Sequence, residues 1–73
     1  MERYLNKSGN SPITYYQIED DSITVWFKGA QKSYVFSYSG QAGRTNVENM
    51  KVLAKSGSGL SAYITKNVKF LYD

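Results

Sequence analysis

The spacing of hydrophobic residues changes once along this chain, near Gly40. Before Gly40, hydrophobic and polar residues alternate, which is typical of strands with one buried face. After Gly40, hydrophobic residues recur every three or four positions, which is typical of amphipathic helices. The change predicts an α+β fold in which helices pack on one face of an antiparallel sheet.

The expected order of elements is three strands followed by two helices. The strands are expected at residues 13–18, 23–29 and 32–38, and the helices at residues 46–56 and 60–70. Short polar connections make the strands antiparallel neighbours in a meander. Thr45 and Glu48 fit a capping box at the start of the first helix, and Gly57 is expected to end that helix in the left-handed conformation.

The chain has 73 residues, which is enough for one domain. Residues 1–11 are polar and turn-prone and are expected to form a flexible arm, so the domain itself spans residues 12–73. One strand face and the two helix faces supply the expected core, which consists of Ile23, Val25, Phe27, Tyr34, Phe36, Val47, Met50, Leu53, Ala54, Leu60, Ile64 and Val68. Aromatic residues make up 15% of the chain, and their large buried area compensates for the thin core of a small domain.

Several residue types that carry protein chemistry are missing. The chain has no Cys and no His, which excludes disulfides, thiolate metal sites and imidazole bases. The acidic run Glu19-Asp20-Asp21 lacks the spaced ligands of a calcium loop and is interpreted as a solvated turn. We therefore expect no cofactor, no metal and no catalytic activity.

No hydrophobic run reaches the roughly 20 residues of a membrane span, and the first residues do not resemble a signal peptide, so a cytoplasmic location is expected.

Trp26 is the most informative single residue. The alternation places it with Thr24 and Lys28 on the open face of the sheet. An exposed aromatic ring beside a lysine can stack an unpaired base. The alternative is that the ring is covered, either by the N-terminal arm or by a second copy of the chain. Both interpretations are open at this point.

The charge of the chain is modestly positive, with a net charge of +3. Such a charge allows weak attraction to a polyanion, and it is also ordinary for a soluble surface. The candidate binding surface combines Trp26 with cations that the predicted fold directs outward, namely Lys28, Arg44, Lys51, Lys55, Lys66 and Lys69.

Several short motifs follow one another in the order of a known family. They are Ile18…Ser22-Ile23-Thr24-Val25-Trp26-Phe27…Gly29…Tyr34-Val35-Phe36 and then Met50…Leu53-Ala54-Lys55-Ser56-Gly57-Ser58-Gly59…Ile64…Tyr72. Over about residues 11–72 this order resembles the KTSC domain, which is named for the C-terminus of some lysyl-tRNA synthetases and also occurs as small bacterial and phage proteins. Two departures stand out. Phe36 replaces the second Tyr of a Tyr-x-Tyr motif, and residues 39–43 replace a proline-containing linker.

The resemblance implies a small α+β domain and, through the synthetase attachment, suggests RNA as the partner. It implies no aminoacylation, because nothing of the synthetase catalytic domain is present in these residues. The leading hypothesis is a non-catalytic module that binds RNA or another polyanion by stacking and phosphate neutralisation. The rival is a protein-interaction or self-assembly module with Trp26 in the interface, which open strand edges would favour.

Overall fold

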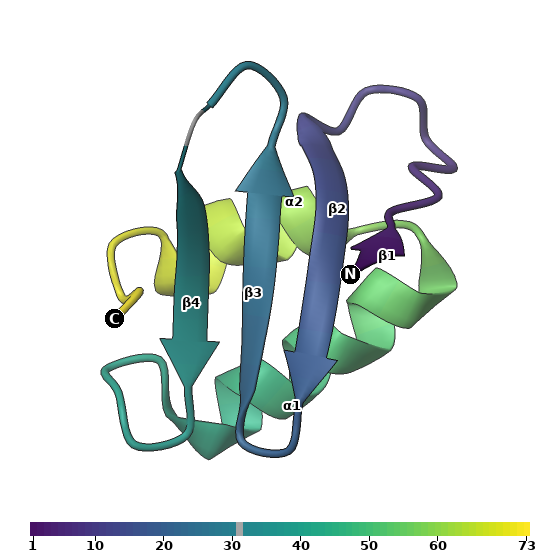
Figure 1. Cartoon of the computed structure of the whole chain (residues 1–73). Helices are drawn as coiled ribbons and strands as arrows, with labels where there is room; N and C mark the ends of the chain where they lie inside the picture. Colours follow the sequence, from purple (N-terminus) through teal and green to yellow (C-terminus); the bar gives the residue numbers. More distant parts are fainter. Residues whose placement is uncertain (31) are drawn as a thin grey trace.

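The computed structural model describes residues 1–30 and 32–73. It shows the expected α+β fold, with an antiparallel sheet in one layer and the helices in another (Figure 1). The strands are β1 (Glu2–Arg3), β2 (Ile13–Glu19), β3 (Ser22–Phe27) and β4 (Ser33–Ser37), and they lie in the order β1-β2-β3-β4. Gln31, in the predicted turn between β3 and β4, lies outside the described residues.

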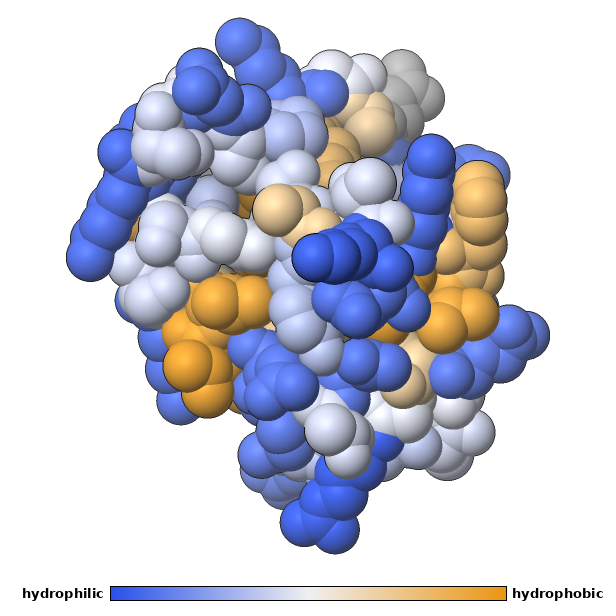
Figure 2. Space-filling view, turned by 180° about the vertical axis from the view of Figure 1, so that it is seen from behind, coloured by the Kyte–Doolittle hydropathy of each residue, from blue (hydrophilic) through white to orange (hydrophobic). Residues whose placement is uncertain are grey.

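The helical layer consists of α1 (Gly43–Ser56), α2 (Leu60–Tyr63) and η1 (Ile64–Val68), a stretch of π-helix that continues α2. The second predicted helix therefore ends at Val68 rather than at residue 70. On its outer side this layer shows separate hydrophobic patches among hydrophilic side chains (Figure 2). Val52 of α1 and Phe70, which follows η1, are exposed hydrophobic residues.

The sequence predicts how α1 begins and how it ends, and only the second of these predictions is confirmed. The predicted capping box is wrong, because α1 begins at Gly43 and Thr45 lies inside its first turn. Ala42 occupies the cap position and makes no side-chain hydrogen bond there. The prediction for the other end is confirmed. Gly57 ends α1 in the left-handed conformation, with φ of 82°, which glycine adopts without steric cost.

The fourth strand, β1, is the main correction to the predicted fold. The sequence predicts three strands and a flexible N-terminal arm, but the arm pairs with β2, and Tyr4 is only 3% exposed. The N–H of Tyr4 donates to the carbonyl of Thr14 (2.9 Å), and the Tyr4 hydroxyl accepts the N–H of Leu60 (3.3 Å). The N–H of Lys7 donates to the carbonyl of Gly57 (2.7 Å). The arm is therefore attached to both layers, and a strand this short shows no alternation by which it could be predicted.

A β-bulge at Thr14 decides which side chains of β2 face the core. The pairing with β3 passes from Ile13 directly to Tyr15, so Thr14 is the extra residue. As a result Ile13 and Tyr16 both point toward the helices, where they are 2% and 9% exposed. Tyr15 points to the opposite face of the sheet and is 40% exposed.

The core lies between the sheet and the helical layer. The predicted core residues that are buried are Ile23, Val25, Phe36, Val47, Met50, Ala54, Leu60, Ile64 and Val68. Phe27, Tyr34 and Leu53 were predicted to be buried and are only partly so, because they lie at the margin of the core. The structure adds Tyr4, Ile13, Tyr16 and Ala42 to the buried set.

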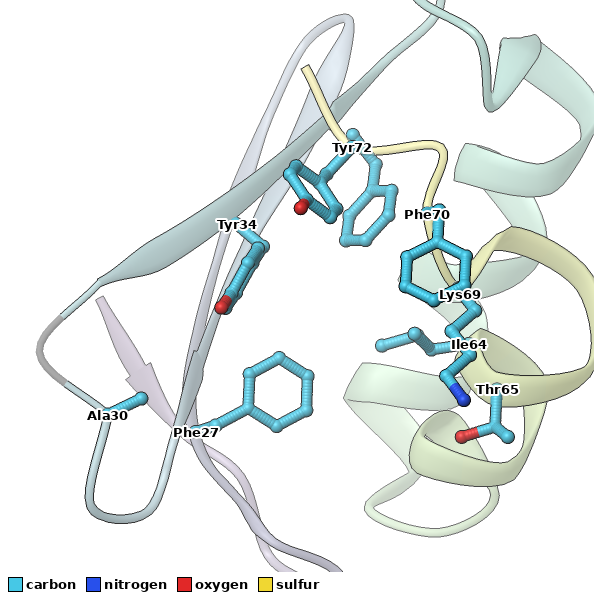
Figure 3. A pocket seen from close by; sticks show the side chains of 9 residues that line it. Phe27, Ala30, Tyr34, Ile64, Thr65, Lys69, Phe70 and Tyr72 are labelled. Atoms are coloured by element: carbon cyan, nitrogen blue, oxygen red, sulfur yellow. The ribbon is translucent and has the colours of Figure 1, made fainter.

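After η1 the chain returns to the edge of β4. The N–H of Asp73 donates to the carbonyl of Val35 in β4 (2.7 Å). Tyr72 consequently lies beside Tyr34, with their ring centroids 4.9 Å apart (Figure 3). Each outer edge of the β2–β4 meander is thus contacted by a segment from one end of the domain, β1 at one edge and Asp73 at the other.

Candidate nucleic-acid interface

The open face of the sheet carries one row of side chains that crosses all four strands. Arg3 of β1 pairs with Tyr15 of β2. Tyr15 pairs in turn with Trp26 of β3, whose other partner is Ser33 of β4. Residues directly opposite each other in antiparallel strands place their side chains on the same face, with Cβ atoms about 4.5–5.5 Å apart. Trp26 therefore has a second aromatic side chain beside it and an arginine one strand further.

Local structure holds this row in place. The bulge at Thr14 brings Tyr15 onto the open face, and the Thr14 hydroxyl donates to the main-chain carbonyl of Trp26 (3.2 Å). Val25, the neighbour of Trp26 along β3, is fully buried on the helical side. Because successive side chains of a strand point to opposite faces, the indole of Trp26 lies away from the helices.

The backbone of the N-terminal arm does not pass over β3, the strand that contains Trp26 (Figure 1). Figure 1 shows that the residues between β1 and β2 run beside β2 and do not cross β3. Trp26 is half-buried in the single chain, and the neighbouring Tyr15 is exposed.

The charges of the sheet face are separated along the strands. Lys28 follows β3 directly at the end of the sheet nearest Trp26, and Arg3 and Lys32 are also exposed. The opposite end, at the turn between β2 and β3, carries the exposed acidic residues 19–21. The positive charges of this face therefore lie at the same end as the aromatic side chains.

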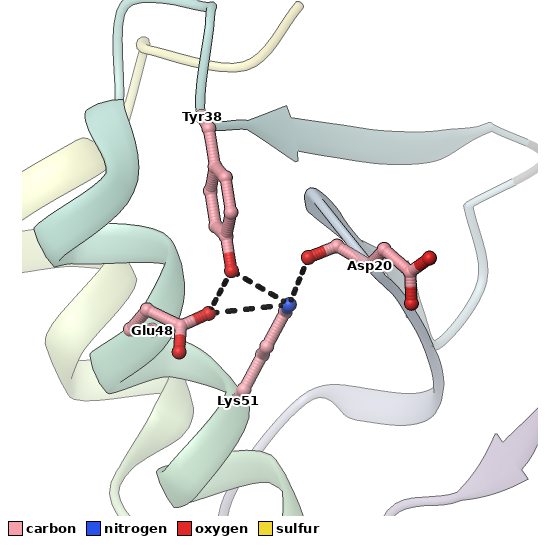
Figure 4. Close-up of polar contacts among 4 residues, drawn as sticks. All are labelled: Asp20, Tyr38, Glu48 and Lys51. Carbon is pink, nitrogen blue, oxygen red and sulfur yellow. Dashed lines mark hydrogen bonds and ion pairs between the residues drawn. The ribbon is translucent and has the colours of Figure 1, made fainter.

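Lys51, one of the predicted surface cations, belongs to a polar cluster (Figure 4). Its ammonium group donates to the main-chain carbonyl of Asp20 (3.1 Å) and to the hydroxyl of Tyr38 (3.2 Å). It also pairs with the carboxylate of Glu48 (3.2 Å), which in turn accepts a hydrogen bond from the Tyr38 hydroxyl. The Lys51 side chain is 12% exposed, so it joins α1 to the sheet rather than facing solvent as predicted. Arg44 lies over the same ring, with its guanidinium carbon 5.1 Å from the Tyr38 centroid.

The contacts in this cluster favour the charged forms of both Glu48 and Lys51. The hydrogen bonds that Tyr38 and then Lys51 donate hold the pKa of Glu48 below its ordinary value. Burial opposes the charged form of Lys51, but its hydrogen bonds with Tyr38 and Glu48 outweigh burial, and the pKa of Lys51 is raised. The pair is therefore charged at neutral pH and is not an acid–base couple that could exchange protons near pH 7.

The Glu48 carboxylate predicts a pH dependence of stability. Because its pKa is lower in the folded chain than its ordinary value of 4.5, its contribution is present above that pH and is lost as the pH falls below it. Glu48→Gln should therefore destabilise the protein at neutral pH and have a progressively smaller effect in acid. Urea denaturation at neutral pH and in acid measures the difference between variant and wild type.

Asp20→Asn is the matched control, because the cluster uses only the main-chain carbonyl of Asp20 (Figure 4). This variant should keep the acid dependence of the wild type. A Glu48→Gln variant that parallels the wild type at every pH would show that Glu48 is unpaired in solution.

The remaining predicted cations lie on the helical side of the molecule. Lys55 is in the last turn of α1, Lys66 is in η1 and Lys69 follows η1, and all three are exposed. The helices cover the face of the sheet opposite Trp26 (Figure 1), so one short ligand cannot contact these lysines and Trp26 together. Lys28 lies two residues after Trp26 along the chain, and Tyr15 and Arg3, which the sequence pattern does not single out, lie in the same cross-strand row as Trp26.

Comparison of the chain with known protein families, with curated proteins and with solved structures finds no match. In residues 1–30 and 32–73, no three His, Cys, Asp or Glu side chains are grouped so as to hold a metal ion. None of the helices that the structure describes has both the length and the hydrophobicity needed to cross a bilayer. The geometry of the open face can stack planar rings and neutralise nearby phosphates.

Proposed function

We propose that Arg3, Tyr15, Trp26 and Lys28, together the open-face site, bind single-stranded RNA. The observation that carries this proposal is the pairing of Tyr15 with Trp26 on a sheet face that no described helix covers (Figure 1). Stacking of a base on an aromatic side chain contributes about 1–3 kcal/mol and tolerates different sequences. A single strand is favoured because bases in a duplex are already stacked on one another. The resemblance to the KTSC domain favours RNA among polyanions.

The charges of the site support a weak and salt-sensitive interaction. Arg3 lies in the same row as the two rings, and Lys28 follows Trp26 along the chain after Phe27. Two neutralised phosphates of a single strand give a slope of about −1.4 for the logarithm of affinity against the logarithm of salt concentration, at about −0.7 per phosphate. Raising the salt concentration from about 50 mM to about 200 mM should therefore lower the affinity several-fold.

The decisive variant is Trp26→Ala. It should bind a single-stranded RNA of about ten nucleotides about 5–150-fold more weakly, which corresponds to the loss of about 1–3 kcal/mol of stacking. Fluorescence anisotropy of end-labelled RNA at low salt measures the affinity, and circular dichroism verifies that the variant folds. Val52→Ala is the control, because Val52 is an exposed hydrophobic residue of α1, in the other layer, and its loss should leave the affinity unchanged.

Two lysine variants extend this test to the charges. Lys28→Gln should weaken binding and reduce the salt slope by about 0.7, whereas Lys55→Gln on the helical side should do neither. An equal effect of the two variants, or no binding by the wild type at low salt, would contradict the proposal. A stable dimer in which Trp26 is protected from a soluble quencher would also contradict it, and would support self-assembly through this face instead.

A further inference from the structure

A groove lies on the helical side of the sheet, between β3 and β4 on one wall and η1 with the segment that follows it on the other (Figure 3). Its volume is about 330 Å³. Phe27, Tyr34 and Phe36 line it from the strands, while Lys69, Phe70 and Tyr72 line it from the segment that follows η1. This volume is at the lower end of the range of small-molecule sites, so it suits a ligand of one or two rings.

The walls of the groove are largely aromatic. Phe27 and Tyr34 meet edge to face with centroids 5.5 Å apart, and Tyr34 meets Tyr72 in the same way at 4.9 Å. The ring of Phe36 continues this arrangement, 6.4 Å from that of Tyr72. Phe70 belongs to the opposite wall and is 74% exposed, so its ring has room to contact a ligand. A planar ring placed here would find aromatic edges and faces at favourable distances.

The positive charge of Lys69 determines which ring-containing ligands suit the groove. The ammonium group of Lys69 lies 5.4 Å from the centroid of Phe70, and Thr65 is on the same wall (Figure 3). Of the nine lining residues, all of which the structure describes, none is acidic. Aromatic clusters also suit quaternary ammonium groups, but Lys69 would repel a cation here. A small hydrated anion such as phosphate would gain nothing from the rings.

We infer that this groove binds a small aromatic carboxylate. The ring of the ligand packs among Phe27, Tyr34 and Phe70, where it loses contact with water. The carboxylate accepts a charge-assisted hydrogen bond from Lys69, and Thr65 offers a second donor on the same wall. The site uses none of the residues of the open-face site and lies on the other face of the sheet, so the two sites are independent.

Phenylacetate and its neutral amide, phenylacetamide, are the probes that test this inference. Each is titrated into the full chain and followed by the main-chain amide NMR signals of Tyr34, Phe70 and Tyr72. Phenylacetate should bind about tenfold more tightly than phenylacetamide, because only the acid forms the charged contact with Lys69. Lys69→Gln should abolish this preference by weakening the acid alone, and Phe70→Ala should weaken both probes.

Two controls keep the outcome distinct from that of the RNA experiment. Lys66→Gln changes an exposed lysine that lies in η1 and does not line the groove, and it should retain the preference for the acid. Trp26→Ala should bind phenylacetate as the wild type does. Equal affinity for acid and amide, an unchanged preference in Lys69→Gln, unchanged binding in Phe70→Ala, or tighter binding of choline than of phenylacetate would each overturn the inference.

Discussion

The Tyr4→Ala variant is expected to have a free energy of unfolding about 3–5 kcal/mol below that of the wild type. Tyr4 is 3% exposed and belongs to the core, and its hydroxyl accepts the N–H of Leu60 at the start of α2. The substitution leaves a cavity the size of a ring and an N–H group without its acceptor. Domains are typically stable by about 5–15 kcal/mol, so a loss of this size would unfold a measurable fraction of the protein. Urea denaturation followed by circular dichroism measures it.

Two further variants test how much of this loss comes from the Tyr4 hydroxyl and whether the rest of its segment matters. Tyr4→Phe keeps the ring and removes only the acceptor, so it should cost less, about 1–3 kcal/mol. Met1→Ala changes a side chain of the same segment that is 69% exposed, and it should stay within about 0.5 kcal/mol of the wild type. If Tyr4→Ala were as stable as Met1→Ala, the N-terminal segment would be the loose arm that its polar sequence suggests.

Phe36→Ala is expected to cause a loss of similar size, about 3–5 kcal/mol, because Phe36 is 1% exposed and lies in β4 against the helical layer. For a domain of this length the loss corresponds to a fall in Tm of about 12–40 °C. Phe27→Ala is the comparison, since Phe27 packs at the margin of the core and should cost less. Thermal denaturation of the two variants ranks them. A larger loss for Phe27 than for Phe36 would contradict the observed burial.

The parts of the fold that the sequence predicts are those in which one face of a long element is buried. In β3, for example, Ile23 and Val25 are both fully buried, and the residues between and beside them are not. The same holds for α1, where Val47, Met50 and Ala54 are buried at helical spacing. β1 could not be predicted in this way, because it has two residues and is held by contacts that Tyr4 makes with distant segments.

The candidate site was predictable only where alternation runs without interruption. Trp26 lies in a regular strand, and its place on the open face followed from that pattern. Strict alternation from Ile13 would place Tyr15 on the buried face, and the bulge at Thr14 reverses this. The prediction that Lys51 faces solvent is wrong for a different reason. Its partners include the carbonyl of Asp20, which is distant in sequence, and helical spacing contains no information about contacts between elements.

The hydrogen bond from Asp73 to Val35 can form only after both residues have been synthesised, and this delay affects how the nascent chain folds. An uncovered strand edge can recruit a strand from another molecule. β1 precedes β2 along the chain and can pair as soon as β2 leaves the ribosome. The edge of β4, in contrast, stays open until the helical layer and Asp73 have left the ribosome and Asp73 can donate to Val35. During this interval the edge of β4 is available to a strand of another nascent chain, and a chaperone that binds nascent chains would protect it.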